Sequence, residues 1–192
     1  TQLVESRRRY QGIFEGAGVA ICVLDMSRLF DLLNSLQVST AEELDKLIKH
    51  QPGQFKRLLL QLRITEVNQV ALDLLGIENS QQAWDYLIDG SPRNPAGTGT
   101  RILHAVLAGE PGLELEIRLT RDGGEDQHLW LVMRLPEERS DYDAVILSIG
   151  DITSRKQMEL SLLDRESFWP DVVRTVPDHL YVQAVLSHRL IY

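Results

Sequence analysis

The sequence predicts an α+β fold in which helices collect on one face of a single antiparallel sheet. Apolar and polar residues alternate strictly from Leu113 to Thr120, as in a half-buried strand. Two short apolar segments early in the chain read as further strands, and leucines at helical spacing lie between them. The 192 residues are 43% hydrophobic and 25% charged, which favours a chain with a real core over a disordered one.

The first half of the chain supplies a helix and two strands. Residues 2–14 form a polar helix with a thin apolar stripe, and Gly16 ends it. Residues 19–24 read as a buried strand and residues 63–67 as a second, short one. We expect both strands to join the same sheet.

A helical insert occupies residues 26–61 between these two strands. Its leucines recur at spacings of three and four residues, and Pro52-Gly53 separates the last two helices. Thr40 and Glu43 fit a capping box, because a hydroxyl and a carboxylate three residues apart satisfy free amide groups at a helix start.

Three short helices follow the second strand. Asn68 is the predicted N-cap of residues 69–75, which Gly76 closes in a left-handed conformation. Ser80 is the predicted cap of residues 81–87. A Gly/Pro/Ser/Asn loop over residues 89–99 then leads to a helix at 101–108.

A three-stranded meander completes the sheet. Residues 113–119 and 129–135 flank the Arg-Asp-Gly-Gly hairpin turn at 121–124, and residues 145–149 form the last strand. From Ser154 the pattern is helical again, and two more apolar strands are predicted within residues 171–192.

Composition and charge narrow the function classes. Twenty basic against 28 acidic residues give a net charge of −8 and repel nucleic acid and anionic lipid. The single cysteine, Cys22, lies in an apolar run and reads as a core residue. No apolar run is long enough to span a bilayer and no signal peptide is apparent, so we expect a cytoplasmic fragment.

Catalytic and metal motifs are missing from the sequence. The five histidines do not stand at ligand spacing, and no Gly-x-Ser-x-Gly elbow is present. We therefore predict no catalytic residue and no metal site, and a small hydrolase is the weakest of the functional alternatives.

Several segments resemble the PAS domain, a sensory box of bacterial signalling proteins. The first matching segments are Arg9 to Ala17 and Ile21 to Asp25. The others are the Glu-Val-Asn segment at 66–68 with its helix, the Asp-Gly-Gly hairpin, and Ile149-Gly150-Asp151-Ile152-Thr153. The last match is the most specific. Ordinary members join the first two strands by a tight turn, whereas this sequence resembles a subgroup with an Asp-x-Ser segment, here Asp25-Met26-Ser27, and a helical insert.

The resemblance implies a division of the chain and a fold. We expect an N-terminal amphipathic helix at 1–12, a PAS sensory domain at 13–153 with its insert at 26–61, a signalling linker helix at 154–170 and a truncated second PAS domain at 171–192. The implied sheet is antiparallel and five-stranded, with helices on one face. Because the chain starts with Thr and stops at Tyr192, we expect a piece of a longer protein.

The resemblance also bears on cofactors. Haem is disfavoured because the family's ligand position falls near Thr98 and not at His104, and flavin because residues 85–97 contain no cysteine. Any ligand is expected to be apolar or mixed, with no tightly held chromophore. The predicted pocket residues come from helices and strands alike: Leu72, Leu75, Trp84, Ile102, Val106, Trp130 and Ser148. The tryptophans could equally fill the core.

The implied function is sensory and not catalytic. Asp151, Thr153 and Arg155 are expected to couple the sheet to the exit helix, although Asp151 could also be a plain cap. The narrow stripes of the N-terminal and linker helices, which include Leu3, Tyr10, Met158, Leu162 and Trp169, favour a parallel homodimer over packing against their own sheet. The implied output is a diguanylate cyclase of the GGDEF type acting in cyclic di-GMP signalling, with or without a phosphodiesterase, or a histidine kinase. A ligand-free interaction domain is the main alternative.

Overall fold

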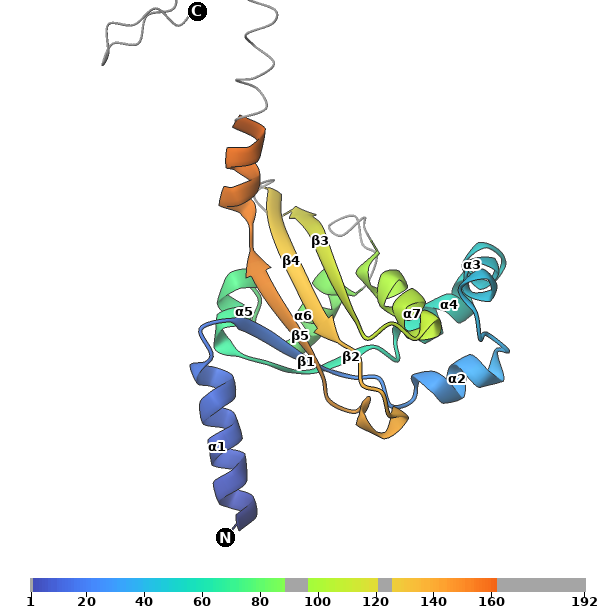
Figure 1. Cartoon of the computed structure of the whole chain (residues 1–192), viewed down its shortest axis with the longest axis horizontal. Helices are drawn as coiled ribbons and strands as arrows, with labels where there is room; N and C mark the ends of the chain where they lie inside the picture. Colours follow the sequence, from blue (N-terminus) through green and yellow to red (C-terminus); the bar gives the residue numbers. More distant parts are fainter. Residues whose placement is uncertain (1, 89–96, 121–125, 162–192) are drawn as a thin grey trace, which may run out of the picture. The chain divides into compact units, whose positions relative to one another are not determined.

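The structure is a computed structural model that describes residues 2–88, 97–120 and 126–161 (Figure 1). It divides into two units, Thr1–Ile152 and Thr153–Tyr192. The first unit contains the whole sheet and its helices. The described part of the second unit is one helix, residues 153–161.

One five-stranded antiparallel sheet organises the first unit, in the order β2-β1-β5-β4-β3 (Figure 1). Its strands are β1 (Ala20–Asp25), β2 (Arg63–Val67), β3 (Gly112–Thr120), β4 (Asp126–Arg134) and β5 (Val145–Asp151). The first strand is an inner strand, between β2 and β5, where Cys22 is paired with Val67 on one side and Leu147 on the other. The predicted sheet and the place of the first strand in it are confirmed.

Helices α5 (Gln69–Leu75), α6 (Ser80–Leu87) and α7 (Thr98–Ala108) lie on one side of the sheet (Figure 1). Alternate residues of β3, β4 and β5 are buried against them, while their neighbours are exposed or half-buried. Because successive strand residues point to opposite faces, the alternation in the sequence gives the sheet one buried face and one more exposed face. The predicted α+β class is confirmed.

The insert forms three short helices, α2 (Leu29–Ser35), α3 (Ala41–His50) and α4 (Pro52–Leu59). Both hydrogen bonds of the Thr40 and Glu43 capping box are present at the start of α3. Pro52 is the first residue of α4 and does not merely separate two helices. Proline suits this position, because the first amide of a helix has no partner within the helix.

Two other helix starts differ from the prediction. The cap of α6 is Asn79, whose side-chain oxygen accepts from the backbone N–H of Gln82, and Ser80 is the first helical residue. Helix α7 begins at Thr98, three residues before the predicted start. Asn68 caps α5, and Gly76 ends it with a φ of 66°, as predicted. The predicted hairpin turn at 121–124 and most of the loop before α7 lie outside the described residues.

The N-terminal helix α1 runs from Gln2 to Gly16 and belongs to the first unit. It is exposed along most of its length, and among its described side chains Phe14 is buried. In the second unit, Glu159 contacts Arg155 at 3.6 Å and Lys156 at 3.4 Å. Leu162, Trp169 and the predicted second PAS domain at 171–192 lie outside the described residues. No helix in the described parts of the chain has the length and apolar character needed to cross a membrane.

The predicted Asp-x-Ser segment is a turn at the end of β1. Asp25 Oδ1 accepts from the backbone N–H of Ser27 at 2.9 Å and from its hydroxyl at 2.6 Å. Its other oxygen pairs with Arg63, which lies opposite on β2. Partial burial acts to raise the pKa of Asp25, but the hydrogen bonds from Ser27 and Arg63 outweigh it and hold that pKa below its ordinary value of 3.8.

This arrangement predicts a loss of stability in acid that depends on Asp25. A carboxyl whose pKa is lower in the folded state stabilises the fold above its unfolded pKa, and this contribution disappears as the pH falls through the folded pKa. Asp25→Asn should therefore lower the free energy of unfolding at pH 7 but make little difference near pH 2. Urea unfolding at both pH values measures this. If the two proteins differed in free energy of unfolding by the same amount at pH 7 and pH 2, the stabilising role of the Asp25 carboxylate would be contradicted.

Candidate functional site

The predicted interior pocket is filled with side chains. Leu75, Ile102 and Val106 are buried among the apolar residues of the sheet, Leu75 and Ile102 almost completely. Leu72 and Trp84 also pack in or against this core but border surface hollows at their outer ends. The structure therefore brings these five residues to the helical side of the sheet, mainly as core.

Trp130 and Ser148 do not join them. Leu131 and Ile149 are paired and buried, so their neighbours on the same strands point to the opposite face. Trp130 is 41% exposed there, and Ser148 is half-buried. The expectation that these two side chains share a pocket with the five helical-side residues is thus corrected by the strand register, which the residue pattern left open.

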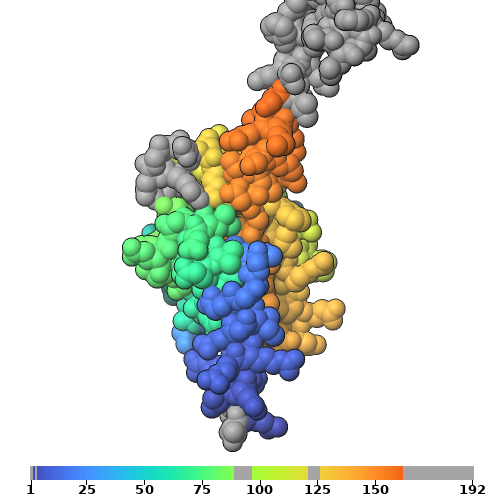
Figure 2. All heavy atoms as spheres, turned by 90° about the vertical axis from the view of Figure 1, so that its left-hand side faces the viewer, coloured from blue at the N-terminus to red at the C-terminus, as the bar shows by residue number. Residues whose placement is uncertain are grey.

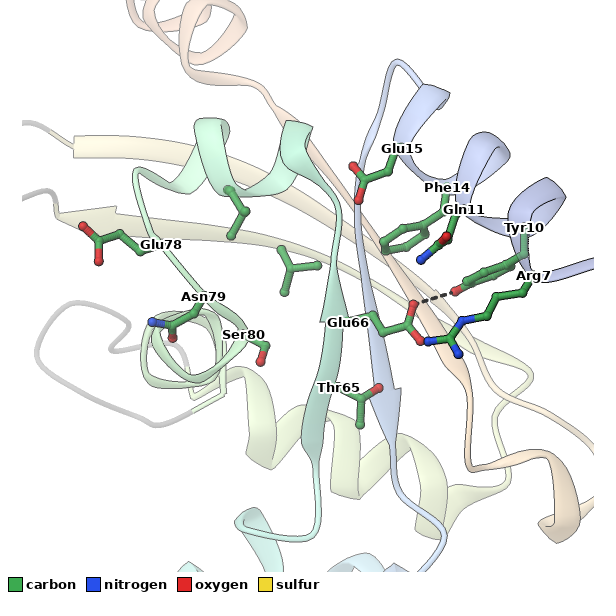
Figure 3. A pocket seen from close by; sticks show the side chains of 12 residues that line it. Arg7, Tyr10, Gln11, Phe14, Glu15, Thr65, Glu66, Glu78, Asn79 and Ser80 are labelled. Atoms are coloured by element: carbon green, nitrogen blue, oxygen red, sulfur yellow. Dashed lines mark hydrogen bonds between the residues drawn. The ribbon is translucent and has the colours of Figure 1, made fainter. Parts of the chain in front are cut away.

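A pocket of about 660 Å³ lies instead beside α1, at the outer strand of the sheet (Figure 3). Figure 2 views the molecule from the side on which α1, in blue, and α5, in green, are both visible. Three segments line the pocket: α1, strand β2, and the region from α5 to the start of α6. The lining residues are Arg7, Tyr10, Gln11, Phe14, Glu15, Thr65, Glu66, Val67, Leu72, Glu78, Asn79 and Ser80.

Asn68 joins the end of α1 to the starts of β1 and α5 beside this pocket. Its side-chain oxygen accepts from the backbone N–H groups of Ile21 and Ala71, each at 3.0 Å. Its amide nitrogen donates to the carbonyls of Phe14 at 3.0 Å and Val19 at 2.9 Å. Since Asn68 is fully buried, one side chain fixes the end of α1, the start of β1 and the start of α5.

Two further contacts attach α1 to the sheet. Glu15 accepts from the backbone N–H of Gln69 at 2.9 Å, and the Tyr10 hydroxyl donates to Glu66 at 3.2 Å (Figure 3). The Tyr10 ring stacks on Phe14, with centroids 5.6 Å apart. Burial, followed by the charge and hydrogen bond of Glu66, raises the pKa of Tyr10, so the phenol remains a proton donor at neutral pH.

This pocket combines an apolar interior with charged borders. Phe14, Val67 and Leu72 supply apolar surface, while Arg7 and three glutamates supply charge at its borders. Across the described residues, no group of three or more His, Cys, Asp or Glu side chains is placed to hold a metal ion. His104, the histidine considered for haem, lies on α7 with its Nε2 atom 3.1 Å from Asp45 of the insert.

The predicted coupling residues divide between the two units. Asp151, at the end of β5, accepts from the Gln127 side chain at 3.1 Å, and the same amide donates to the carbonyl of Leu74 at 3.1 Å. This links the last strand to the end of α5. Thr153 and Arg155 lie in the helix of the second unit, where Arg155 pairs with Glu159.

Sequence reasoning missed Gln127, Tyr10–Glu66 and Glu15–Gln69. Gln127 had one available indication, because it is a polar residue on the buried phase of an otherwise apolar strand. Tyr10 and Glu66 are 56 positions apart, and a local sequence pattern relates only residues that are close together in the chain. Their contact depends on how α1 leaves the sheet.

Comparison with known proteins gives a family match inside this framework. Residues 57–107, which run from α4 through α7, match the family model described as "PAS domain". No curated protein matches the chain.

Three of the solved structures to which this chain is similar are the following. The PAS domain of an HTR-like protein from Haloarcula marismortui is 16% identical, with a TM-score of 0.44 and coverage of 79% of this chain and 95% of that one. The LOV protein of Rhodobacter sphaeroides is 16% identical, with a TM-score of 0.46 and coverage of 78% and 68%. A domain of a sensory box sensor histidine kinase/response regulator from Geobacter sulfurreducens is 14% identical, with a TM-score of 0.43 and coverage of 78% and 96%. The family match thus covers residues 57–107, about a quarter of the chain, and these residues are similar to a PAS domain.

Proposed function

We propose that this chain is the sensory and regulatory module of a multidomain bacterial signal-transduction protein, in which a ligand or a dimerisation signal is relayed through terminal helices. The supporting observation is the attachment of α1 over the pocket by Asn68, Glu15 and Tyr10. An occupant of this pocket would contact the helix directly. Binding would therefore favour one placement of α1 over another, as any ligand with different affinities for two states does.

The relay at the other end of the domain would use Asp151. The Gln127 side chain donates hydrogen bonds both to this carboxylate and to the end of α5. A shift of α5 would therefore move Gln127 and change its hydrogen bond to Asp151 at the end of β5. Thr153 then follows, and Arg155 lies in the linker helix, which we propose extends over residues 154–170. The division into an N-terminal helix at 1–12, a sensory domain at 13–153 and a second PAS domain from 171 is part of the same proposal.

The output domain belongs to the proposal as well. We infer a diguanylate cyclase, with or without a phosphodiesterase, or a histidine kinase, acting in the cytoplasm as a homodimer. The proposed ligand is small and apolar or mixed. The absence of a cysteine in residues 85–97 and the position of His104 remain our reasons for disfavouring flavin and haem.

A ligand-free dimerisation domain is the second candidate. The close packing of Leu75 and Ile102 against the sheet favours it, because the space between sheet and helices is occupied by the protein's own side chains. In that case the contacts of Tyr10 and Glu15 would set the direction of α1 permanently, and only the partner helices would carry the signal.

Removing the proposed dimerisation helices should give a monomer. The full chain, a chain lacking residues 1–12, a chain ending at residue 157 and a chain with both deletions would be compared by multi-angle light scattering. We expect a dimer for the full chain, weaker association for each single deletion and a monomer for the double deletion, since each helix contributes only a narrow apolar stripe. A dimer that survives the double deletion would show that another surface joins the protomers.

A further inference from the structure

A second hollowed surface lies beside the helical insert and extends to Thr65 of β2, which also lines the α1 pocket. One hollow of about 550 Å³ lies between α2 and α4, and another of about 330 Å³ lies between β2 and α6. Leu60 borders both, so they are adjacent parts of one groove, which we call the Leu60 groove. Because α2 and α4 belong to the insert, the insert creates most of this groove.

Leu60 is an apolar side chain that the fold leaves uncovered. It is 48% exposed, whereas Leu58 and Leu59 immediately before it are buried. Consecutive helical residues point about 100° apart, so three leucines in a row cannot all face one core. The half-buried Leu32 adds apolar surface to the first hollow, and the edge of the largely buried Trp84 borders the second.

The charge of the groove is opposite to that of the chain. Arg28 and Arg57 border the first hollow, against the carboxylate of Asp31, while Arg63 at the second hollow is already paired with Asp25. The whole chain carries a net charge of −8. A local basic surface with an apolar floor attracts a partner that carries acidic residues around an apolar anchor.

The backbone beside the groove disfavours a partner in extended form. Strand β2 is the edge of the sheet, but Val23 faces Glu66 while Leu24 faces Ile64, so Thr65 is an extra, bulged residue. The Thr65 hydroxyl donates to the carbonyl of Val23 at 3.2 Å. A bulge on a five-residue edge strand blocks regular addition of another strand.

We propose that the Leu60 groove is a docking site for a short amphipathic helix of another protein or domain, with glutamate or aspartate on both sides of a leucine-type anchor. The anchor would cover Leu60 and the apolar floor, and the acidic residues would pair with Arg28 and Arg57. This mode is a helix laid in a groove, with apolar contact for affinity and charge for selectivity. It does not depend on the α1 pocket or on the proposed sensory function.

Fluorescence anisotropy with labelled synthetic peptides tests the proposal on the full chain. The probe is a 14-residue capped peptide with leucines at helical spacing and glutamates on both flanks, and its match carries lysines instead of glutamates. We expect the glutamate peptide to bind roughly tenfold or more tightly than the lysine peptide, with affinity falling as salt is added. Equal binding of the two peptides would overturn the proposal. So would binding of decanoate by NMR without binding of the peptide, because the site would then serve a small anionic amphiphile.

Variants place the binding on this groove. Arg57→Glu and Leu60→Ser should each weaken the glutamate peptide roughly tenfold, as expected for central contacts of an interface. Lys49→Glu, an exposed residue of α3 outside the groove, makes the same change in net charge as Arg57→Glu and should change affinity less than about twofold. Circular dichroism checks that each variant is folded, and Arg28→Gln replaces Arg57→Glu if the latter unfolds. An equal loss for Lys49→Glu and the groove variants would overturn the assignment.

Discussion

Replacement of Asn68 by alanine should lower the free energy of unfolding by about 3 kcal/mol, because it removes an N-cap and leaves several buried backbone groups without a partner. The side chain accepts from two backbone amides and donates to two carbonyls, and it is fully buried. Water cannot readily replace it there. Urea unfolding followed by circular dichroism measures the change.

Asn79→Ala is the matched control for this prediction. Asn79 caps α6 as Asn68 caps α5, but it is exposed and its side chain accepts one hydrogen bond, from Gln82. A surface cap of this kind contributes about 1 kcal/mol. Equal losses for the two variants would mean that Asn68 acts as a cap alone and that its contacts to Phe14 and Val19 contribute little.

Replacement of Gly99 by alanine should lower the free energy of unfolding by about 2 to 3 kcal/mol through overpacking. A Cβ atom on Gly99 would lie 2.6 Å from Leu59 Cδ2 and 2.8 Å from the carbonyl oxygen of Ile88. The leucine can rotate, but the Ile88 carbonyl is backbone and moves only with the end of α6. Helix α7 would therefore have to withdraw from both the insert and α6.

Gly53→Ala in α4 separates this effect from the general properties of alanine. A Cβ atom there meets nothing within 4 Å, so the substitution should be neutral or stabilise the protein by up to about 1 kcal/mol through helix propensity. Thermal and urea unfolding of both variants would be compared with the original chain. Stability of Gly99→Ala equal to that of Gly53→Ala would show that α7 adjusts without cost and that the close approach is not a constraint.

Local chemistry let the sequence determine most elements and their ends. The strict alternation of β3 predicts a strand with one buried face, and Asn68 and Gly76 predict both ends of α5. The capping box at Thr40 locates the start of α3. In each case the controlling interactions join residues no more than five positions apart, so a linear pattern contains them. Where two capping residues adjoin, as at Asn79 and Ser80, the pattern alone assigned the wrong one.

Only the tertiary structure decided the candidate site, because its contacts join residues far apart in sequence. Placing β1 between β2 and β5 brings α1 beside β2 and lets Tyr10 reach Glu66. The register of β4 on β5 turns Trp130 away from the helices, and a slip of one residue would have turned it inward. An alternating pattern shows that the two faces of a strand differ, but it does not show which face the helices cover. In the same way, the packing of the insert and not the local sequence decided that Leu60 stays exposed, with Arg28, Arg57 and Arg63 around it. Long-range pairing and packing, which no short segment encodes, therefore set where this protein can bind.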